Sequence, residues 1–267
     1  MRTLDAVFTK LGEPRATPTD EQLYTTLAPL YRVLYVARNR IEGQLATVER
    51  VAAGLVARPL VSDTTTVLEL GCGTGHLLAE LESSFGTAVG ADPSPEMAHI
   101  ARERAAHVCQ ADAHAFATDS ADVAVLLGAV LGHIRPDSAG QAAVSELRRT
   151  LRPGGRVVCS VHRSVAEPRS RELTRRVDGY EITQHDVQRP ADEGTFEWQV
   201  TFEMTHEATG ETRRVSTATT LRAFTPSELT AWFERAGFES IVTRPREYVA
   251  GPGETDRAFL LTARCPP

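Results

Sequence analysis

The stretch Val67-Leu-Glu-Leu-Gly-Cys-Gly-Thr-Gly75 decides the fold, because an apolar run leads directly into three glycines at alternate positions. The run 67–70 is typical of a buried strand, and residues 76–81 carry the apolar spacing of a helix. Glycine has no Cβ, so a ligand can approach the backbone of this turn closely. A strand, a glycine turn and a helix N-terminus together predict the nucleotide-binding corner of a doubly wound α/β domain.

The spacing of the glycines indicates which ligand binds at this corner. Dinucleotide-binding proteins use G-x-G-x-x-G, and His76 stands where the third glycine of that motif would fall. The longer run 69–75 resembles motif I of the class I S-adenosylmethionine-dependent methyltransferases. The resemblance implies S-adenosylmethionine as the cofactor, with S-adenosylhomocysteine as its product. It also implies a cofactor-binding set made of Glu69, Gly71, Cys72, Gly73 and Gly75.

An acid follows the second predicted strand at a distance that suits a ribose. Val89-Gly-Ala-Asp92 places a carboxylate 21 residues beyond Gly71. A carboxylate at about this distance accepts hydrogen bonds from both ribose hydroxyls, and Pro93 follows it in the same predicted site. The alternative is that Asp92 is the N-cap of a helix that begins at residues 93–95.

A third strand, residues 108–111, ends in a second acid, Asp112. The family resemblance implies that Asp112 binds the adenine amino group, that the backbone N–H of Ala113 binds a ring nitrogen, and that Met97 covers the ring. The alternatives are a surface turn for Asp112 and plain core packing for Met97.

The remaining pattern completes a seven-stranded sheet. Further strands are predicted at 121–127, 156–161, 237–242 and 258–263, with helices at 138–150 and 226–236 between them. The last strand is expected to pair antiparallel with its neighbour. We therefore predict an α/β fold with a seven-stranded doubly wound sheet, an antiparallel last strand, N-terminal lid helices and an antiparallel β insert.

Two segments flank or interrupt the predicted core. Apolar residues at helical intervals over 21–58 predict one or two lid helices after a polar, mobile tail at 1–20. Tyr24 lies near Tyr31 and Tyr35, and 27–31 resembles the N-terminal helix that closes over the methionine end of the cofactor in small-molecule methyltransferases. These tyrosines are therefore candidates for the acceptor pocket, with half-buried helix packing as the alternative.

The insert follows the core strands. Residues 196–204 alternate apolar and polar side chains, and 213–224 form a second extended run, which together predict a hairpin with a possible third strand at 178–183. The arginine-rich run 169–176 is interpreted as an exposed helix face. The layout resembles that of glycine N-methyltransferases and amino-sugar N-methyltransferases, which implies that the insert lies over the active site. The predicted organisation is a tail with lid helices (1–58), a cofactor-binding core (59–163), the insert (164–224) and a closing helix-and-strand unit (225–267).

The composition narrows the class of protein. The 267 residues are 42% hydrophobic, enough for one full core and a small appendage. There is no apolar stretch of 18 residues and no secretory leader at the start, and four cysteines are scattered without metal-ligand spacing. The net charge of −6 argues against nucleic-acid binding. We expect a cytoplasmic protein with no metal, no membrane span and a small-molecule partner; a homodimer stays open.

The base should lie beyond the fourth strand, where the methyl group will be. Gly128 in this loop permits close approach to the methionine part of the cofactor, and His133 follows on the next turn. A neutral histidine with a pKa near ~6.5 can take a proton from an ammonium or hydroxyl group. The string 132–134 also resembles the G-H-L string of the amino-sugar enzymes. His133 is the first catalytic candidate, with packing or capping as the alternative, and His162 and Tyr24 follow it.

These observations predict S-adenosylmethionine-dependent methyl transfer to nitrogen or oxygen of a small molecule, a secondary metabolite rather than a macromolecule. Two alternatives remain open at this point: a nicotinamide-dependent oxidoreductase and a non-catalytic S-adenosylhomocysteine-binding protein. Fold alone cannot name the acceptor.

Overall fold

The computed structural model describes residues 2–11, 23–34, 38–53, 64–112, 116–192, 194–245 and 257–267. The chain divides into two compact units, each made of two segments. The larger unit comprises Arg38–Ser164 and Arg222–Pro267, and the smaller unit comprises Met1–Ala37 and Val165–Leu221.

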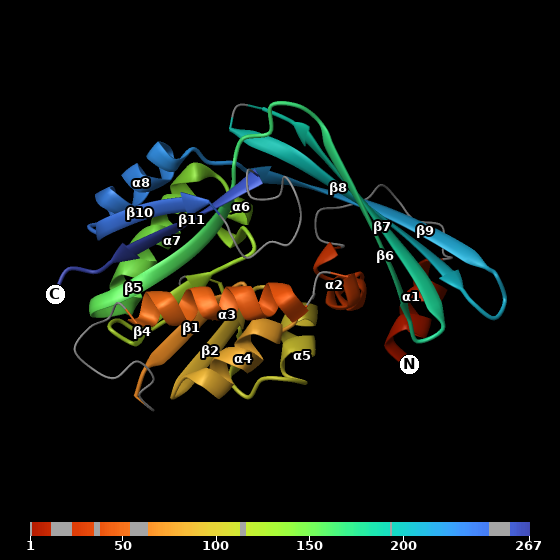
Figure 1. Ribbon diagram of the computed structural model, residues 1–267, viewed down its shortest axis with the longest axis horizontal. Coiled ribbons are helices and arrows are strands. Elements are labelled where there is room, and N and C mark those ends of the chain that lie inside the picture. The colour runs from red at the N-terminus through yellow and green to blue at the C-terminus, as the bar shows by residue number, and fades with distance from the viewer. Residues whose placement is uncertain are drawn as a thin grey trace. The chain divides into compact units, whose positions relative to one another are not determined.

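The larger unit is built on a seven-stranded sheet with the strand order β10-β11-β5-β4-β1-β2-β3 (Figure 1). Its strands are β1 (Thr66–Leu70), β2 (Thr87–Asp92), β3 (Val108–Gln110), β4 (Ala121–Leu126), β5 (Leu151–His162), β10 (Glu239–Pro245) and β11 (Ala258–Arg264). Strand β11 runs antiparallel to both of its neighbours, and the pairs among β1 to β5 are parallel. The predicted fold class is therefore confirmed, including the antiparallel last strand.

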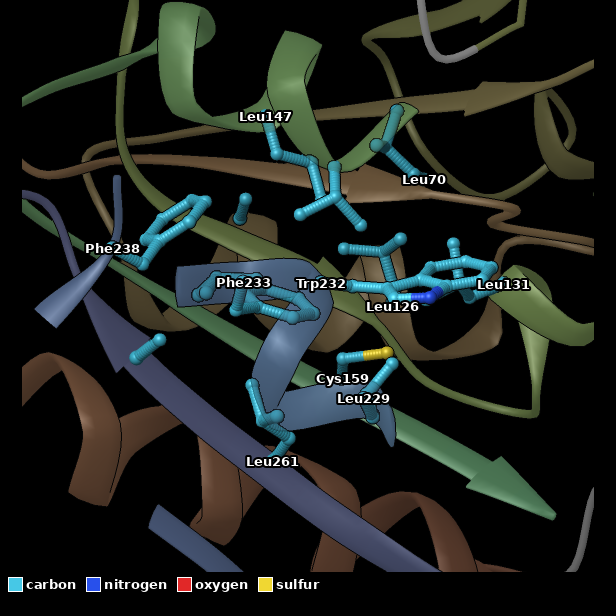
Figure 2. Packing of buried hydrophobic residues seen from close by; sticks show 14 of the residues in the cluster. Leu70, Leu126, Leu131, Leu147, Cys159, Leu229, Trp232, Phe233, Phe238 and Leu261 are labelled. Atoms are coloured by element: carbon cyan, nitrogen blue, oxygen red, sulfur yellow. The ribbon is translucent and has the colours of Figure 1, made fainter. Parts of the chain in front are cut away.

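Helices cover both faces of this sheet (Figure 1). The helices are α3 (Arg38–Ala53), α4 (His76–Ser84), α5 (Pro95–Ala101), α6 (Val130–His133), α7 (Asp137–Thr150) and α8 (Pro226–Arg235). One face packs against α3 and α4 through a cluster that includes Val48, Val67 and Leu78. The other packs against α7 and α8, where Trp232 and Phe233 meet apolar side chains of the strands (Figure 2). A sheet buried on both faces explains why its central strands read as continuous apolar runs.

Local sequence signals fix the ends of two helices. The Thr225 hydroxyl accepts the Glu228 N–H, and the Glu228 side chain accepts the Thr225 N–H, so α8 begins with a complete capping box. Gly237 follows α8 with φ +85°, a conformation that glycine adopts without steric cost. Helix α5 begins after Ser94, whose hydroxyl accepts the Met97 N–H.

Among the described residues, the smaller unit comprises a four-stranded sheet in chain order and two helices (Figure 1). Its elements are α1 (Arg2–Leu11), α2 (Ala28–Leu34), β6 (Arg169–Val177), β7 (Tyr180–Pro190), β8 (Thr195–His206) and β9 (Thr212–Arg222). The structure corrects the interpretation of 169–176 as a helix face, because this run is the edge strand β6. Alternating arginines suit such a position, since charged side chains on an edge strand oppose pairing with other chains.

The start of the chain also differs from the prediction of a mobile tail, because residues 2–11 form helix α1. Leu4, Val7, Phe8 and Leu11 are buried at helical spacing in one cluster with strands β7 and β8. The Tyr180 hydroxyl donates to Asp5 at 2.8 Å, and the Arg213 guanidinium lies 4.4 Å from the centre of the Phe8 ring. A ten-residue helix is marginal alone, so these tertiary contacts stabilise it.

No helix in the described ranges combines the length and apolarity needed to cross a membrane.

Candidate active site

The glycine turn after β1 contains three left-handed residues, and the structure separates their roles. Gly71, Gly73 and Gly75 have φ values of +66°, +54° and +76°. A Cβ on Gly71 would lie 2.5 Å from a Val130 methyl carbon, and one on Gly75 would lie 2.9 Å from the Ala101 backbone. A Cβ on Gly73 would meet no described atom within 4 Å. Gly71 and Gly75 thus permit protein packing, and Gly73 is the position open to a ligand.

Asp92, at the end of β2, is hydrogen-bonded to the glycine turn. One carboxylate oxygen accepts the Gly73 N–H at 2.9 Å, and the other accepts the Ser94 N–H at 2.9 Å. Ser94 is the N-cap of α5, so the alternative role of Asp92 as that cap is excluded. Burial raises the pKa of Asp92, and the two N–H donors lower it in part. Each oxygen has a second lone pair, which leaves acceptors for two further hydroxyl donors.

Glu69 is the second buried carboxylate at this edge. Its side chain is on β1 and is buried, and within the described residues Oε2 has no hydrogen-bond partner. Burial raises the pKa of Glu69 well above its usual value, and the negative charge of Asp92 raises it further. A buried carboxylate with an open oxygen is costly unless a cation or donor completes it. The pair Glu69 and Asp92 therefore favours a positively charged, hydroxyl-bearing ligand.

Cys72 contributes to this turn through packing and its backbone. Its Sγ lies 3.1 Å from the place where a Cβ on Gly90 would stand, and its backbone O accepts the Gly75 N–H. Burial and the nearby carboxylates raise the thiol pKa, so Cys72 stays a neutral thiol. All four cysteines, Cys72, Cys109, Cys159 and Cys265, are free.

The three residues predicted to hold an adenine ring, and Pro93 of the predicted ribose site, are in different surroundings. Met97 is fully buried on α5, and its N–H donates to the Ser94 hydroxyl. Pro93 and Asp112 are exposed, and Ala113 lies outside the described residues. The roles of these four residues stay predictions.

The loop after β4 has an unusual backbone. Gly128 has φ +91° and Ala129 has φ +67°. The Ser160 hydroxyl on β5, itself fully buried, accepts the Gly128 N–H at 2.9 Å and the Ala129 N–H at a longer 3.5 Å. Ser160 was missed at the level of sequence, although a polar residue inside the apolar run 157–161 was a signal for it.

His133, the first catalytic candidate, ends helix α6 just beyond this loop and is half-buried. Burial lowers its pKa from 6.5 to about 4, and the charge of Arg135 lowers it further in the same direction. The imidazole is therefore neutral at pH 7, as expected, but it is a weaker base than the sequence-based pKa near ~6.5 suggested.

The other two candidates differ in their location. His162 is half-buried at the end of β5, where its backbone O accepts the Phe224 N–H. Tyr24 belongs to the smaller unit, where its ring lies 6.0 Å from that of Tyr31 beside the apolar cluster. Tyr35 lies outside the described residues.

The larger unit thus gathers several of the predicted site residues, together with Ser160, at one edge of its sheet. Glu69, Asp92, Gly128, Ser160 and His162 are at or near the carboxyl ends of β1, β2, β4 and β5, which run parallel. In open α/β sheets this edge is where ligands bind. Within the described residues no group of three or more His, Cys, Asp or Glu side chains could hold a metal ion.

Comparison with known proteins decides what kind of domain this is. Residues 67–155, which include the glycine turn, Asp92 and the β4 loop, match the family model described as a methyltransferase domain. The chain carries a methyltransferase domain. The resemblance of its core to the class I S-adenosylmethionine-dependent methyltransferases is confirmed.

Curated relatives match part of this chain. It is 37% identical over 134 residues to a trans-aconitate 2-methyltransferase of Azoarcus sp. (strain BH72), covering 49% of this chain and 51% of that protein. It is 30% identical over 154 residues to a tRNA (carboxymethyluridine(34)-5-O)-methyltransferase of Arabidopsis thaliana, covering 57% of this chain and 35% of that protein. The chain therefore spans about half the length of the first relative and less of the second.

Solved structures match the chain over most of its length. The similarity to DesVI of Streptomyces venezuelae has a TM-score of 0.76 at 20% identity and covers 90% of this chain and 98% of that one. The sugar N-methyltransferase KedS8 of Streptoalloteichus sp. gives a TM-score of 0.72 at 21% identity, with 96% of each chain covered. CalS10, an amino pentose methyltransferase of Micromonospora echinaspora whose structure contains S-adenosylmethionine, gives 0.70 at 20% identity and covers 94% of this chain and 98% of that one. At these identities the likeness shows the fold.

Proposed function

We propose that this protein transfers a methyl group from S-adenosylmethionine to a nitrogen atom of a small molecule, and that the acceptor is a secondary metabolite. The observation that carries the proposal is the arrangement of Glu69, Gly73 and Asp92 around one turn of a methyltransferase domain. The proposal covers the activity of the whole protein, of which the matched domain is one part.

The residues present fit this cofactor by their chemistry. Asp92 would hold the ribose hydroxyls, because each of its oxygens keeps a lone pair beyond the backbone bonds to Gly73 and Ser94. Glu69 would face the positively charged methionine end, since its open Oε2 is a buried acceptor that needs a cation or donor. Gly73 leaves room for the ligand against the backbone. NAD carries a negatively charged pyrophosphate instead, which a second buried carboxylate disfavours.

The bound cofactor supplies a methyl group that is already activated as a sulfonium, so the protein has to align the acceptor and keep water out. Gly128 leaves open space at the end of β4, where the methyl group is expected. His133 is neutral at pH 7 and can accept a hydrogen bond from the acceptor, with His162 and Tyr24 as further candidates. Its role is orientation first and proton removal second.

The low pKa of His133 supports nitrogen over oxygen as the acceptor. A hydroxyl must lose its proton to become a good nucleophile, and a base with a pKa of about 4 takes that proton poorly. A neutral amine attacks with its own lone pair and can lose its proton afterwards. The names of KedS8, a sugar N-methyltransferase, and CalS10, an amino pentose methyltransferase, support the same choice.

The four free cysteines support the predicted reducing compartment, the cytoplasm.

The test is product formation from methyl-labelled S-adenosylmethionine. The purified protein would be incubated with separate panels of amines, amino sugars, phenols and carboxylic acids, and each product would be identified by mass spectrometry. We expect label on an amine or amino sugar and none in the Asp92→Asn variant.

Label on phenol or carboxylate oxygen would overturn the choice of nitrogen and leave methyl transfer intact. Tight binding of S-adenosylhomocysteine without turnover on any panel would favour a non-catalytic binding protein. Hydride transfer with a nicotinamide cofactor would overturn the proposal.

A further inference from the structure

The β4 loop contains a conformation that L-residues with a side chain rarely adopt. Gly128 and Ala129 are consecutive left-handed residues, with φ values of +91° and +67°. Glycine adopts such angles freely, whereas alanine does so at a steric cost. Strained residues of this kind persist only where the surrounding structure holds them, and they cluster at functional sites.

One side chain holds both of these residues. The Ser160 hydroxyl accepts the Gly128 N–H at 2.9 Å and the Ala129 N–H at 3.5 Å, and the Ser160 side chain is fully buried on β5. Two amides that converge on one hydroxyl fix the direction of the chain as it leaves β4. Without that oxygen both N–H groups would lose a buried acceptor.

The segment that follows the held loop packs against the glycine turn at one end and against the backbone of Arg222 at the other. Val130 begins α6 directly after Ala129 and lies against Gly71, where an added Cβ would come within 2.5 Å of it. At the other end of α6, a Cβ on Gly132 would lie 2.8 Å from the backbone O of Arg222. A shift of the loop would therefore move Val130 against the glycine turn and carry His133 with it.

We propose that Ser160 is a positioning residue: it holds Gly128 and Ala129 in the left-handed conformation and thereby sets the relation of the β4 loop to the glycine turn. The proposal rests on the proposed function only for its effect on cofactor and turnover. The contacts between Ser160 and the loop are made within the protein and do not depend on a bound ligand.

The first measurement uses the protein without ligand. Amide hydrogen exchange of Gly128 and Ala129 would be followed by NMR in the wild type, in Ser160→Ala and in Val161→Ala. Val161 is the matched control, because it is a fully buried neighbour on the same strand whose truncation costs stability without removing the acceptor. We expect exchange at both amides to speed up at least tenfold in Ser160→Ala relative to Val161→Ala. Equal exchange in the two variants would overturn the proposal.

The second measurement is S-adenosylhomocysteine binding by calorimetry, with turnover where an acceptor is known. We expect Ser160→Ala to weaken binding about tenfold, with Val161→Ala within twofold of the wild type, and Ser160→Thr to keep most of the affinity because it retains the hydroxyl. Faster amide exchange with no binding even in the wild type would support the positioning of the loop and overturn the proposed function instead.

A double-mutant cycle with Ala129→Gly keeps the proposal testable if the threonine variant does not fold. Glycine removes the steric cost at position 129, so the loop should need Ser160 less. We expect the loss of affinity caused by Ser160→Ala to be several-fold smaller in the Ala129→Gly background. Strictly additive losses would contradict the role of Ser160 in holding that residue.

Discussion

The two units of this chain reach their structures by different means. The larger unit depends on particular backbone positions: three left-handed glycines within five residues, and a buried carboxylate that ties the end of β2 to them. The smaller unit depends on a general pattern, in which the apolar face of a sheet packs against two short helices. Features that need one residue type at one position produce a recognisable motif in the sequence. Packing of an apolar face produces only a periodic pattern of apolar residues.

The comparisons divide along the same line. The family model matches 67–155, which lies wholly within the larger unit. The solved structures cover at least 90% of the chain, but at about 20% identity. The smaller unit therefore lies outside the family match, although most of the chain is covered by the solved structures. We expect substitutions of Asp92 and Gly73 in the larger unit to weaken cofactor binding, and substitutions in the smaller unit to change stability alone.

The largest expected effect is that of Asp92→Ala on cofactor binding. Two charge-assisted hydrogen bonds to the ribose would be lost, each worth roughly 1.5–3 kcal/mol, so affinity should fall about a hundredfold or more. The matched control is Asp122→Ala, since Asp122 accepts the Thr66 N–H at 2.8 Å and pairs with Arg152 at 2.7 Å at the start of β4. Calorimetry should show near wild-type affinity in the control. Equal losses in both variants would contradict the assignment.

The glycine turn offers a second contrast inside the larger unit. Gly75→Ala places a Cβ 2.9 Å from the Ala101 backbone at a left-handed residue, so unfolding free energy should fall by roughly 2–5 kcal/mol. Gly73→Ala meets no described atom, so it should cost only about 1–2 kcal/mol in stability but weaken cofactor binding strongly. Denaturant unfolding and calorimetry on both variants separate the two roles. If Gly73→Ala were less stable than Gly75→Ala, the packing described around the turn would be contradicted.

Stability should depend on pH through His133. Its pKa is lowered from 6.5 to about 4, so the unfolded state binds a proton where the folded state does not. The free energy of unfolding is therefore unaffected by this group above pH 6.5. It falls by a total of ~3 kcal/mol as the pH drops from 6.5 to about 4. Between pH 8 and pH 4, the unfolding free energy of the wild type should fall by ~3 kcal/mol relative to that of His133→Gln. Parallel curves would indicate that His133 titrates normally.

The smallest effect is expected in the smaller unit. Tyr180→Phe removes the hydroxyl that donates to Asp5 at 2.8 Å, which should lower unfolding free energy by about 1 kcal/mol. Cofactor affinity should not change. Thermal unfolding measures the loss of stability, and calorimetry measures the cofactor affinity. A tenfold loss of cofactor affinity in Tyr180→Phe would contradict the assignment of cofactor binding to the larger unit.

The sequence predicted those parts of the structure that depend on single residues. The glycine turn and Asp92 at the end of β2 each need a particular residue at a particular place, so both could be recognised in the sequence. Helix α1 and strand β6 were not foreseen, because a ten-residue helix and an arginine-rich edge strand are stable only through what they pack against.

Two features of the site lay beyond sequence reasoning for a related reason. The pKa of His133 depends on burial in the folded chain, and the role of Ser160 depends on two amides some thirty residues away. Neither feature produces a characteristic spacing of residues in the sequence. The role of Ser160 could be assigned only once β4 and β5 were placed side by side.

The central claim is that the edge of the larger sheet binds S-adenosylmethionine, and ligand calorimetry on the whole wild-type protein tests it most directly. S-adenosylhomocysteine and NAD would be titrated separately into the purified protein under the same conditions. We expect saturable one-to-one binding of S-adenosylhomocysteine and no measurable binding of NAD. Tight binding of NAD, or no heat with S-adenosylhomocysteine, would contradict it.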